Sequence, residues 1–268
     1  MIFGKQENMF FLTKQIKFTK FAKKKTKSLF FSSIKPSQNH YNSEYLNREN
    51  FDLIYEKIKD ARREKDAPVD YFGSEACVEQ GGGKEAENFQ RLIALIISVQ
   101  NRDKSTAEAM DKMKKNGLSL EQINEMDEES IKNMIGNVNY KNKKAKFIKQ
   151  AASIIKNKYD SVIPTKLEEL LEFPGIGYKI AVLYLNDTLQ DNIGIGVDTH
   201  VHRIANRLGW VNTKEDRNKT RTELESFIPK EKWRELNGLL VGFGQQICLP
   251  IQPKCHSCPL KFLCPIPK

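Results

Sequence analysis

Four of the five cysteines lie in the last 21 residues of the chain, within the segment CLPIQPKCHSCPLKFLC. Their spacing is C-x6-C-x2-C-x5-C, and thiolates separated in this way can wrap one soft metal centre. Spacing alone leaves two centres open, a tetrahedral zinc ion and a four-cysteine iron–sulfur cluster. The sequence therefore predicts one metal site, whose ligands are Cys248, Cys255, Cys258 and Cys264.

Cysteine usage and hydropathy also limit the class of protein. No apolar segment with a cleavage site opens the chain, so a secreted disulfide framework is not expected and the clustered thiols indicate metal. Cys77 lies far from the cluster in a glycine-rich segment and is expected to be a free thiol. No run approaches the 18 consecutive apolar residues of a membrane-spanning helix, so no membrane partner is expected.

The positive charge is concentrated at the N-terminus. The net charge is +10, which favours a polyanionic partner, but residues 1–40 contain nine lysines against the single acid Glu7. Any nucleic-acid-binding face on the remainder must therefore be a local patch. Residues 1–44 are expected to be a disordered basic tail. The tail is typical of a mitochondrial presequence, its KFAKKKTK segment suits a nuclear signal, and a solvated basic arm is the third alternative.

Apolar periodicity predicts an all-α fold. From Glu44 to Lys65 apolar residues recur every three or four positions, and NFQRLIALIISVQ is apolar nearly all round, so both are predicted helices. DAPVD is expected to end the first helix, and SEACVEQGGGKEAE to form a polar loop. No segment alternates convincingly between apolar and polar residues. Further helices are predicted over Asp103–Lys115, Ser119–Met126, Asp127–Ile135, Lys143–Tyr159, Leu167–Phe173, Ile180–Leu189 and Asp198–Gly209, and within TRTELESFI and EKWRELNGLLVGFGQQIC.

The segment LLEFPGIGYKIAVLYL predicts a helix, a Pro-Gly-x-Gly hairpin and a second helix. Gly175 and Gly177 allow the backbone to turn tightly and to approach a partner closely. The turn leaves amide N–H groups at the start of the second helix, where a nucleic-acid phosphate is a natural ligand. A plain connection between two helices is the alternative. Lys179 lies two residues after Gly177, and the hairpin alone does not show what its role is.

The segment GVDTHVHRIANRLG places Asp198 at the expected N-cap of another helix. Capping alone accounts for an aspartate at such a position. His200 and His202 are not paired with acids or cysteines at metal-ligand spacing, so both are expected to be structural.

Together and in this order, the three stretches resemble the endonuclease III family of helix–hairpin–helix DNA glycosylases. FPGIGYKIA is similar to the family's L-P-G-x-G-x-K hairpin, VDTHVHRIANRL to its aspartate segment, and the cysteine tail to its cluster loop. DAPVD, SVQNRDKSTAEAM, NKKAKFIKQ and NGLLVGFGQQICLP resemble the eukaryotic branch of the family. The resemblance covers roughly residues 45–265.

The resemblance implies two helical domains with a DNA cleft between them. A six-helix domain that contains the hairpin would span residues 87–192, and residues 45–86 and 193–268 would form the second domain. One [4Fe-4S] cluster on the four clustered cysteines would close the second domain through a loop at 248–264. The implied partner is double-stranded DNA with oxidised bases or abasic sites, bound by a monomer in the nucleus, the mitochondrion or both.

The resemblance also assigns roles to single residues. Lys179 stands at the family's nucleophile position, Asp198 at its aspartate and Gln100 at its gap-filling glutamine. Tyr140 occupies the second wedge position, although Asn139 stands where relatives tend to carry glycine. In the loop of the cluster, Lys254 would help to position DNA, whereas Tyr178, between Gly177 and Lys179, receives no role.

The implied activity is that of a bifunctional DNA glycosylase and abasic-site lyase acting on oxidised pyrimidines. A lysine can displace the base at the sugar's C1′ only as a neutral amine. The position of Lys179 in the first helical turn and its partial burial are expected to lower its pKa, whereas Asp198 is expected to raise it. A non-catalytic DNA-damage-binding protein and a zinc-type structural module are the competing interpretations.

Overall fold

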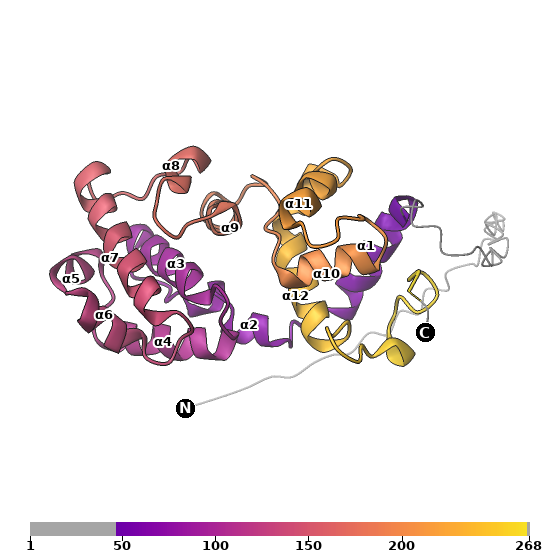
Figure 1. Ribbon diagram of the computed structural model, residues 1–268, viewed down its shortest axis with the longest axis horizontal. Helices are drawn as coiled ribbons and strands as arrows, with labels where there is room; N and C mark the ends of the chain where they lie inside the picture. The colour runs from indigo at the N-terminus through magenta and orange to yellow at the C-terminus, as the bar shows by residue number, and fades with distance from the viewer. Residues whose placement is uncertain (1–46, 267–268) are drawn as a thin grey trace, which may run out of the picture. The chain divides into compact units, whose positions relative to one another are not determined.

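The computed structural model describes residues 47–266, and within this range the chain is helical with no β-strand (Figure 1). The predicted all-α class is therefore confirmed. The tail predicted for residues 1–44 lies outside the described residues. Twelve α-helices follow one another: α1 Phe51–Ala61, α2 Pro68–Phe72, α3 Lys84–Ser98, α4 Asp103–Lys115, α5 Leu120–Glu125, α6 Glu128–Ile135, α7 Lys141–Lys158, α8 Leu167–Leu171, α9 Tyr178–Leu189, α10 Thr199–Arg207, α11 Arg217–Glu225 and α12 Trp233–Gln246.

Helix α3 is central to the first of two hydrophobic cores. Every residue from Asn88 to Ile97 is buried, as expected for a helix that is apolar nearly all round. Helices α4, α7 and α9 pack against α3, and Figure 1 shows α3 to α7 gathered together. The first core draws its buried residues from Cys77 to Leu185, so it includes both the buried Cys77 thiol and the second helix of the hairpin.

The second core is built from residues that come before and after the first core in the sequence. Phe51 of α1 packs its ring against Trp210, with 4.9 Å between the ring centroids, and against Phe227 at 5.6 Å. Such aromatic contacts add about 0.5–1.5 kcal/mol each beyond the area that they bury. Buried residues of α1, α10 and α12 and Leu260 complete this core. The predicted domain boundaries stay a prediction.

Gln245 of helix α12 contacts both α4 and α2. Gln245 donates from its Nε2 atom to Oδ2 of Asp103 at 2.7 Å, and its Oε1 atom accepts from the amide of Val69 at 2.9 Å. Gln245 therefore joins α12, α4 and α2 at one point. This junction fixes the start of α4, which lies close to the candidate site.

The structure differs from the predicted elements mainly between residues 66 and 88. Helix α2 lies where only the end of the first helix and a polar loop were expected. Pro68 starts α2, and Asp70 accepts from the amide of Ala67 at 2.8 Å, so local capping rather than apolar periodicity defines this five-residue helix. Helix α3 begins at Lys84 rather than Asn88, directly after Gly83, whose φ of +92° ends the loop. Among the described residues no helix is both long and apolar enough to cross a membrane.

Candidate functional site

The hairpin connects α8 and α9, and its two glycines have different surroundings. Gly175 has a φ of +81°, and a Cβ atom on it would lie 2.3 Å from the ring of Phe147. Gly177 has an ordinary φ of −97°, and no atom would lie within 4 Å of its Cβ. Gly175 is therefore required by the turn itself. Gly177 instead keeps the space in front of α9 open.

Lys179 is the second residue of α9 and is partly buried. Burial lowers the pKa of its amine, the charge of Arg217 lowers it further, and Asp198 and Asp103 raise it without reversing the net direction. Among residues 47–266 no hydrogen bond or ion pair holds the amine. The neutral form, which is the nucleophilic one, is thus easier to reach than in an ordinary lysine.

Asp198 lies near Lys179 although the two belong to different helices. Its Oδ1 atom accepts from the amide of Val201 at 2.8 Å, so it caps the N-terminus of α10. Its charge is also close enough to raise the pKa of Lys179. One carboxylate oxygen serves the cap, which leaves the other available to a ligand. The fold thus brings together the two residues that were expected to carry the chemistry.

Asp103, a second acid near Lys179, was not predicted. It is the first residue of α4, and its Oδ2 atom accepts from Gln245. Burial raises the pKa of Asp103, the nearby charge of Asp198 raises it further, and Lys179 lowers it. An aspartate at a helix start is normally a capping or dipole-compensating residue, so periodicity gives it no special meaning. Its only signal was its place in SVQNRDKSTAEAM, three residues after Gln100.

The two histidines have protein partners. His202 lies 2.7 Å from Oγ1 of Thr220, measured from its Nδ1 atom, which agrees with a structural role. The Nδ1 atom of His200 lies 3.2 Å from Arg203. Burial lowers the pKa of His200, whereas the charge of Asp198 raises it. His200 is therefore closer to the site than a purely structural assignment implies.

The two predicted wedge residues are exposed and lie in neighbouring loops. Gln100 has a φ of +51° and Tyr140 a φ of +57°, and the Tyr140 side chain is 60% exposed. Asn139 donates from its Nδ2 atom to the backbone carbonyl of Gln100 at 2.7 Å. Left-handed backbone at residues other than glycine costs roughly 1–3 kcal/mol and persists where the surroundings enforce it. Asn139 thus has a structural reason to replace glycine, because it links the two loops.

The four clustered cysteines line one pocket whose walls include Phe243, Ile247 and Leu260. None of the four forms a disulfide, and an apolar lining of this kind limits the access of water. Among the described residues, no three potential ligands gather tightly enough to form a ready-made site for one ion. The donor set of four thiols around one apolar pocket fits a four-thiolate centre.

Helix α10 holds the loop that carries these cysteines. Arg203 donates to the backbone carbonyl of Cys248 at 2.9 Å, and Arg207 donates to those of Leu249 at 2.6 Å and Pro250 at 2.8 Å. Lys254 is exposed on the same loop, and its backbone amide bonds to Ile247 at 2.9 Å. The exposed side chain of Lys254 is compatible with its predicted contact to DNA.

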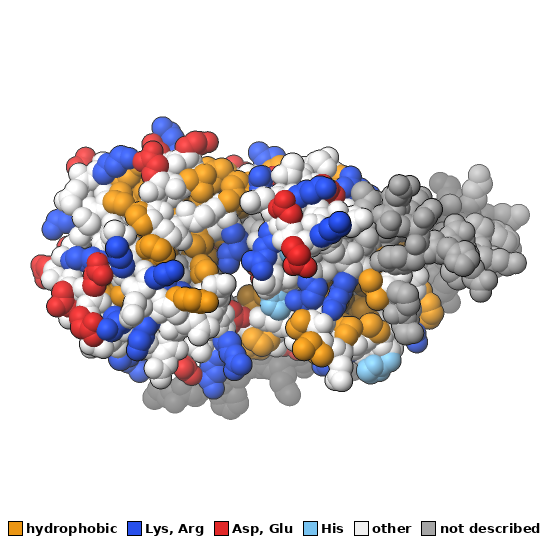
Figure 2. All heavy atoms as spheres, in the orientation of Figure 1, with side chains coloured by type: hydrophobic (Ala, Val, Ile, Leu, Met, Phe, Trp, Pro, Cys, Tyr) orange, Lys and Arg blue, Asp and Glu red, His pale blue; other side chains and the backbone are white. Residues whose placement is uncertain are grey.

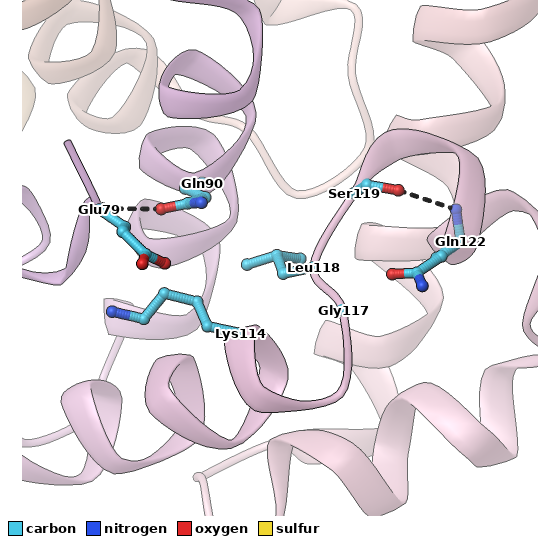
Figure 3. Close-up of a pocket in the computed structure, with 7 residues that line it drawn as sticks. All are labelled: Glu79, Gln90, Lys114, Gly117, Leu118, Ser119 and Gln122. Atoms are coloured by element: carbon cyan, nitrogen blue, oxygen red, sulfur yellow. Dashed lines mark hydrogen bonds between the residues drawn. The ribbon is translucent and has the colours of Figure 1, made fainter. Parts of the chain in front are cut away.

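A second pocket lies at the end of α4 and the start of α5 (Figure 3). Two hydrogen bonds join residues that line it: Gln90 accepts from the amide of Glu79 at 2.8 Å, and Ser119 accepts from the amide of Gln122 at 3.2 Å. Figure 3 shows both hydrogen bonds at opposite sides of Leu118. None of the predicted site residues lines this pocket, so it is not part of the candidate site.

Comparisons with known proteins point to one family of DNA repair proteins. Residues 93–230 match the family model described as "HhH-GPD superfamily base excision DNA repair protein". The chain is 42% identical over 222 residues to endonuclease III-like protein 1 of Gallus gallus, covering 82% of this chain and 79% of the relative. It is 41% identical over 226 residues to endonuclease III homolog 1, chloroplastic, of Arabidopsis thaliana, covering 81% of this chain and 59% of that protein. A solved non-covalent endonuclease III–DNA complex aligns with a TM-score of 0.71 at 24% identity, over 82% of this chain and 96% of that chain.

The chain belongs to the endonuclease III family, within the HhH-GPD superfamily of base excision repair DNA glycosylases. The expected family is therefore confirmed. The roles of the individual residues stay predictions.

Proposed function

We propose that this chain is a bifunctional DNA N-glycosylase and abasic-site lyase that removes oxidised pyrimidines from double-stranded DNA. The observation that carries the proposal is Lys179, an unpaired and partly buried lysine of lowered pKa beside Asp198. Relatives include endonuclease III proteins, and solved neighbours include non-covalent and trapped covalent complexes of endonuclease III with DNA. Both support damaged duplex DNA as the partner.

The reaction begins with extrusion of the damaged nucleotide, because a base in a duplex cannot be reached by a side chain. Gln100 and Tyr140 fill the gap from their two loops. The Nζ atom of Lys179 then forms a bond to C1′ while the glycosidic bond breaks, and the base leaves with a proton. Opening of the sugar ring yields a Schiff base. Loss of a C2′ proton from the Schiff base expels the 3′ phosphate by β-elimination.

Asp198 supports this sequence electrostatically and as a proton acceptor. Its carboxylate stabilises the cationic sugar of the transition state and assists proton transfers. The cap that it forms on α10 fixes its orientation, so the capping and catalytic roles are compatible. Figure 2 shows lysine and arginine side chains spread over the visible face in several small groups rather than in one continuous stripe.

Alanine substitutions at the two hairpin glycines should have different effects, one on stability and the other on DNA binding. Gly175→Ala should lower the free energy of unfolding by about 1–3 kcal/mol, because alanine resists a φ of +81° and meets Phe147. Gly177→Ala should leave stability within about 0.5 kcal/mol of wild type. It should nevertheless weaken duplex binding by roughly tenfold or more, because the new methyl group blocks a phosphate from the amides. Urea denaturation and fluorescence anisotropy measure the two effects, and equal behaviour of both variants would contradict this division.

The four clustered cysteines are proposed to hold one [4Fe-4S] cluster as a structural and DNA-positioning element. When bound, the cluster supplies a cross-link that fixes the loop carrying Lys254. Anaerobically purified protein should be brown and contain about four iron atoms per chain. Cys258→Ser should lose this iron, whereas Cys77→Ala should retain it, because Cys77 is buried in the first core. A colourless wild-type protein with one zinc ion per chain would contradict the proposal.

The activity itself is tested with duplexes that carry thymine glycol, an abasic site or 8-oxoguanine. We expect cleavage of thymine glycol and abasic duplexes, and covalent trapping of the wild-type protein on both by borohydride. Binding without trapping would favour the non-catalytic alternative. We further propose that the enzyme acts as a monomer. We also propose that it acts in the nucleus, the mitochondrion or both, and the basic composition of residues 1–44 supports this location.

A further inference from the structure

Tyr178, the residue directly before Lys179, is held by two residues of α11. Its hydroxyl donates to Oε1 of Glu225 at 3.1 Å, and the guanidinium of Arg221 lies over its ring, 4.2 Å from the centroid. Arg221 in turn pairs with Oε2 of Glu225 at 2.8 Å. The start of α9 is therefore fixed by a closed set of three side chains to α11, a helix that contributes Leu224 to the second core.

Glu225 also holds the chain segment that leads to Asp198. The Oε1 atom that accepts from Tyr178 accepts from the amide of Ile195 at 2.9 Å. Ile195 lies three residues before Asp198, and Tyr178 lies one residue before Lys179. One oxygen of Glu225 thus accepts hydrogen bonds from a residue next to Lys179 and from a residue close to Asp198.

The surroundings of this carboxylate make the arrangement tight. The Glu225 side chain is 15% exposed, and a Cβ atom on Gly194 would lie 2.4 Å from the Tyr178 hydroxyl. Burial raises the pKa of Tyr178 and the charge of Glu225 raises it further, so the phenol remains a donor. Hydrogen bonds to a charged acceptor are the stronger kind, about 1.5–3 kcal/mol each.

We propose that Tyr178 and Glu225 are positioning residues that set the distance between the Lys179 amine and the Asp198 carboxylate. The inference rests on the proposed function, because it presumes that Lys179 is the nucleophile. The Tyr178 hydroxyl donates its proton to Glu225, so that proton is not available to a DNA phosphate. Small errors in the placement of reacting atoms are costly, since a shift of about 1 Å can reduce a rate roughly 100-fold.

The test is Tyr178→Phe, which removes the hydroxyl but keeps the ring under Arg221. We expect the rate constant of borohydride trapping on abasic duplex to fall about 10- to 100-fold. The dissociation constant for an uncleavable abasic analogue should stay within about twofold of wild type, since no DNA contact is lost. A longer distance weakens the effect of the Asp198 charge on the pKa of Lys179, so the midpoint of the trapping pH profile should move to lower pH, in the direction expected for Asp198→Asn but by less.

Tyr55→Phe is the matched control, because Tyr55 of α1 also donates from a buried ring to a glutamate, Glu235 of α12. It should lose at least as much thermal stability as Tyr178→Phe yet trap at the wild-type rate. Glu225→Gln keeps an acceptor oxygen and should retain more activity than Glu225→Ala. The inference is overturned if Tyr178→Phe traps like wild type, if it weakens DNA binding equally, or if Tyr55→Phe loses the same rate. Absence of trapping by wild type would instead overturn the proposed function, and this inference with it.

Discussion

Lys179→Gln should abolish borohydride trapping on abasic duplex and lower strand cleavage by roughly 1,000-fold or more. Glutamine is close to lysine in length but has no nucleophilic nitrogen, so no Schiff base forms. The rate of trapping by wild type should rise with pH and level off above the pKa of Lys179. Because burial lowers that pKa, the plateau should begin below the pH at which an ordinary lysine becomes neutral. Single-turnover trapping over a range of pH values measures both effects.

The position of the covalent bond provides the control for this prediction. Lys144 is another lysine whose pKa burial lowers, to about 8, but its amine donates to the carbonyl of Ile97 at 2.6 Å in the interior. Peptide mapping of the trapped wild-type adduct should therefore find DNA on Lys179 and none on Lys144. An adduct at any other lysine would contradict the assignment, and full trapping by Lys179→Gln would do the same.

Asp198→Asn should lower base excision by about 100- to 10,000-fold while the protein stays folded. Asparagine can still accept from the amide of Val201, so the cap on α10 persists and only the negative charge is lost. Asp198→Ala removes both and should cost a further 0.5–2 kcal/mol or so of stability. Glycosylase assays under single-turnover conditions, together with thermal denaturation, separate the two contributions.

The same variant makes a prediction about pH. The charge of Asp198 raises the pKa of Lys179, so its removal should shift the midpoint of any remaining trapping to lower pH. Asp127→Asn serves as the control, because Asp127 caps α6 through the amide of Ser130 at 2.7 Å. That variant should match wild type in rate and midpoint. A midpoint that moves upward in Asp198→Asn would rule out this electrostatic account.

Sequence reasoning succeeded where local signals decide the structure. Helix α4 has the predicted bounds Asp103–Lys115, and α6 begins one residue after its predicted start at Asp127. Helix α2 was missed because a five-residue helix set by Pro68 and Asp70 has no apolar stripe to detect. Its start depends on one side-chain cap rather than on a repeated pattern.

The predicted pair Lys179 and Asp198 was found because each lies in a distinctive local motif, and the structure places them near each other. Asp103 and Tyr178 could not be assigned in this way. The contact of Asp103 with Gln245 spans 142 positions, and that of Tyr178 with Glu225 spans 47. Neither partner is marked by spacing, because such contacts arise only when distant helices pack. The reason why asparagine stands at position 139 could not be predicted either, since its hydrogen bond to Gln100 spans 39 positions.

Helix α10 connects the candidate site to the cysteine loop. Its nine residues span about 13 Å, with Asp198 at one end and Arg207 at the other. Arg203 and Arg207 fasten the far end to the backbone of the cysteine loop. If that loop unfolds, α10 loses these hydrogen bonds at its far end, and we expect the Asp198 carboxylate at the opposite end to lose its alignment. We therefore expect the state of the thiols to affect the orientation of the Asp198 carboxylate through α10.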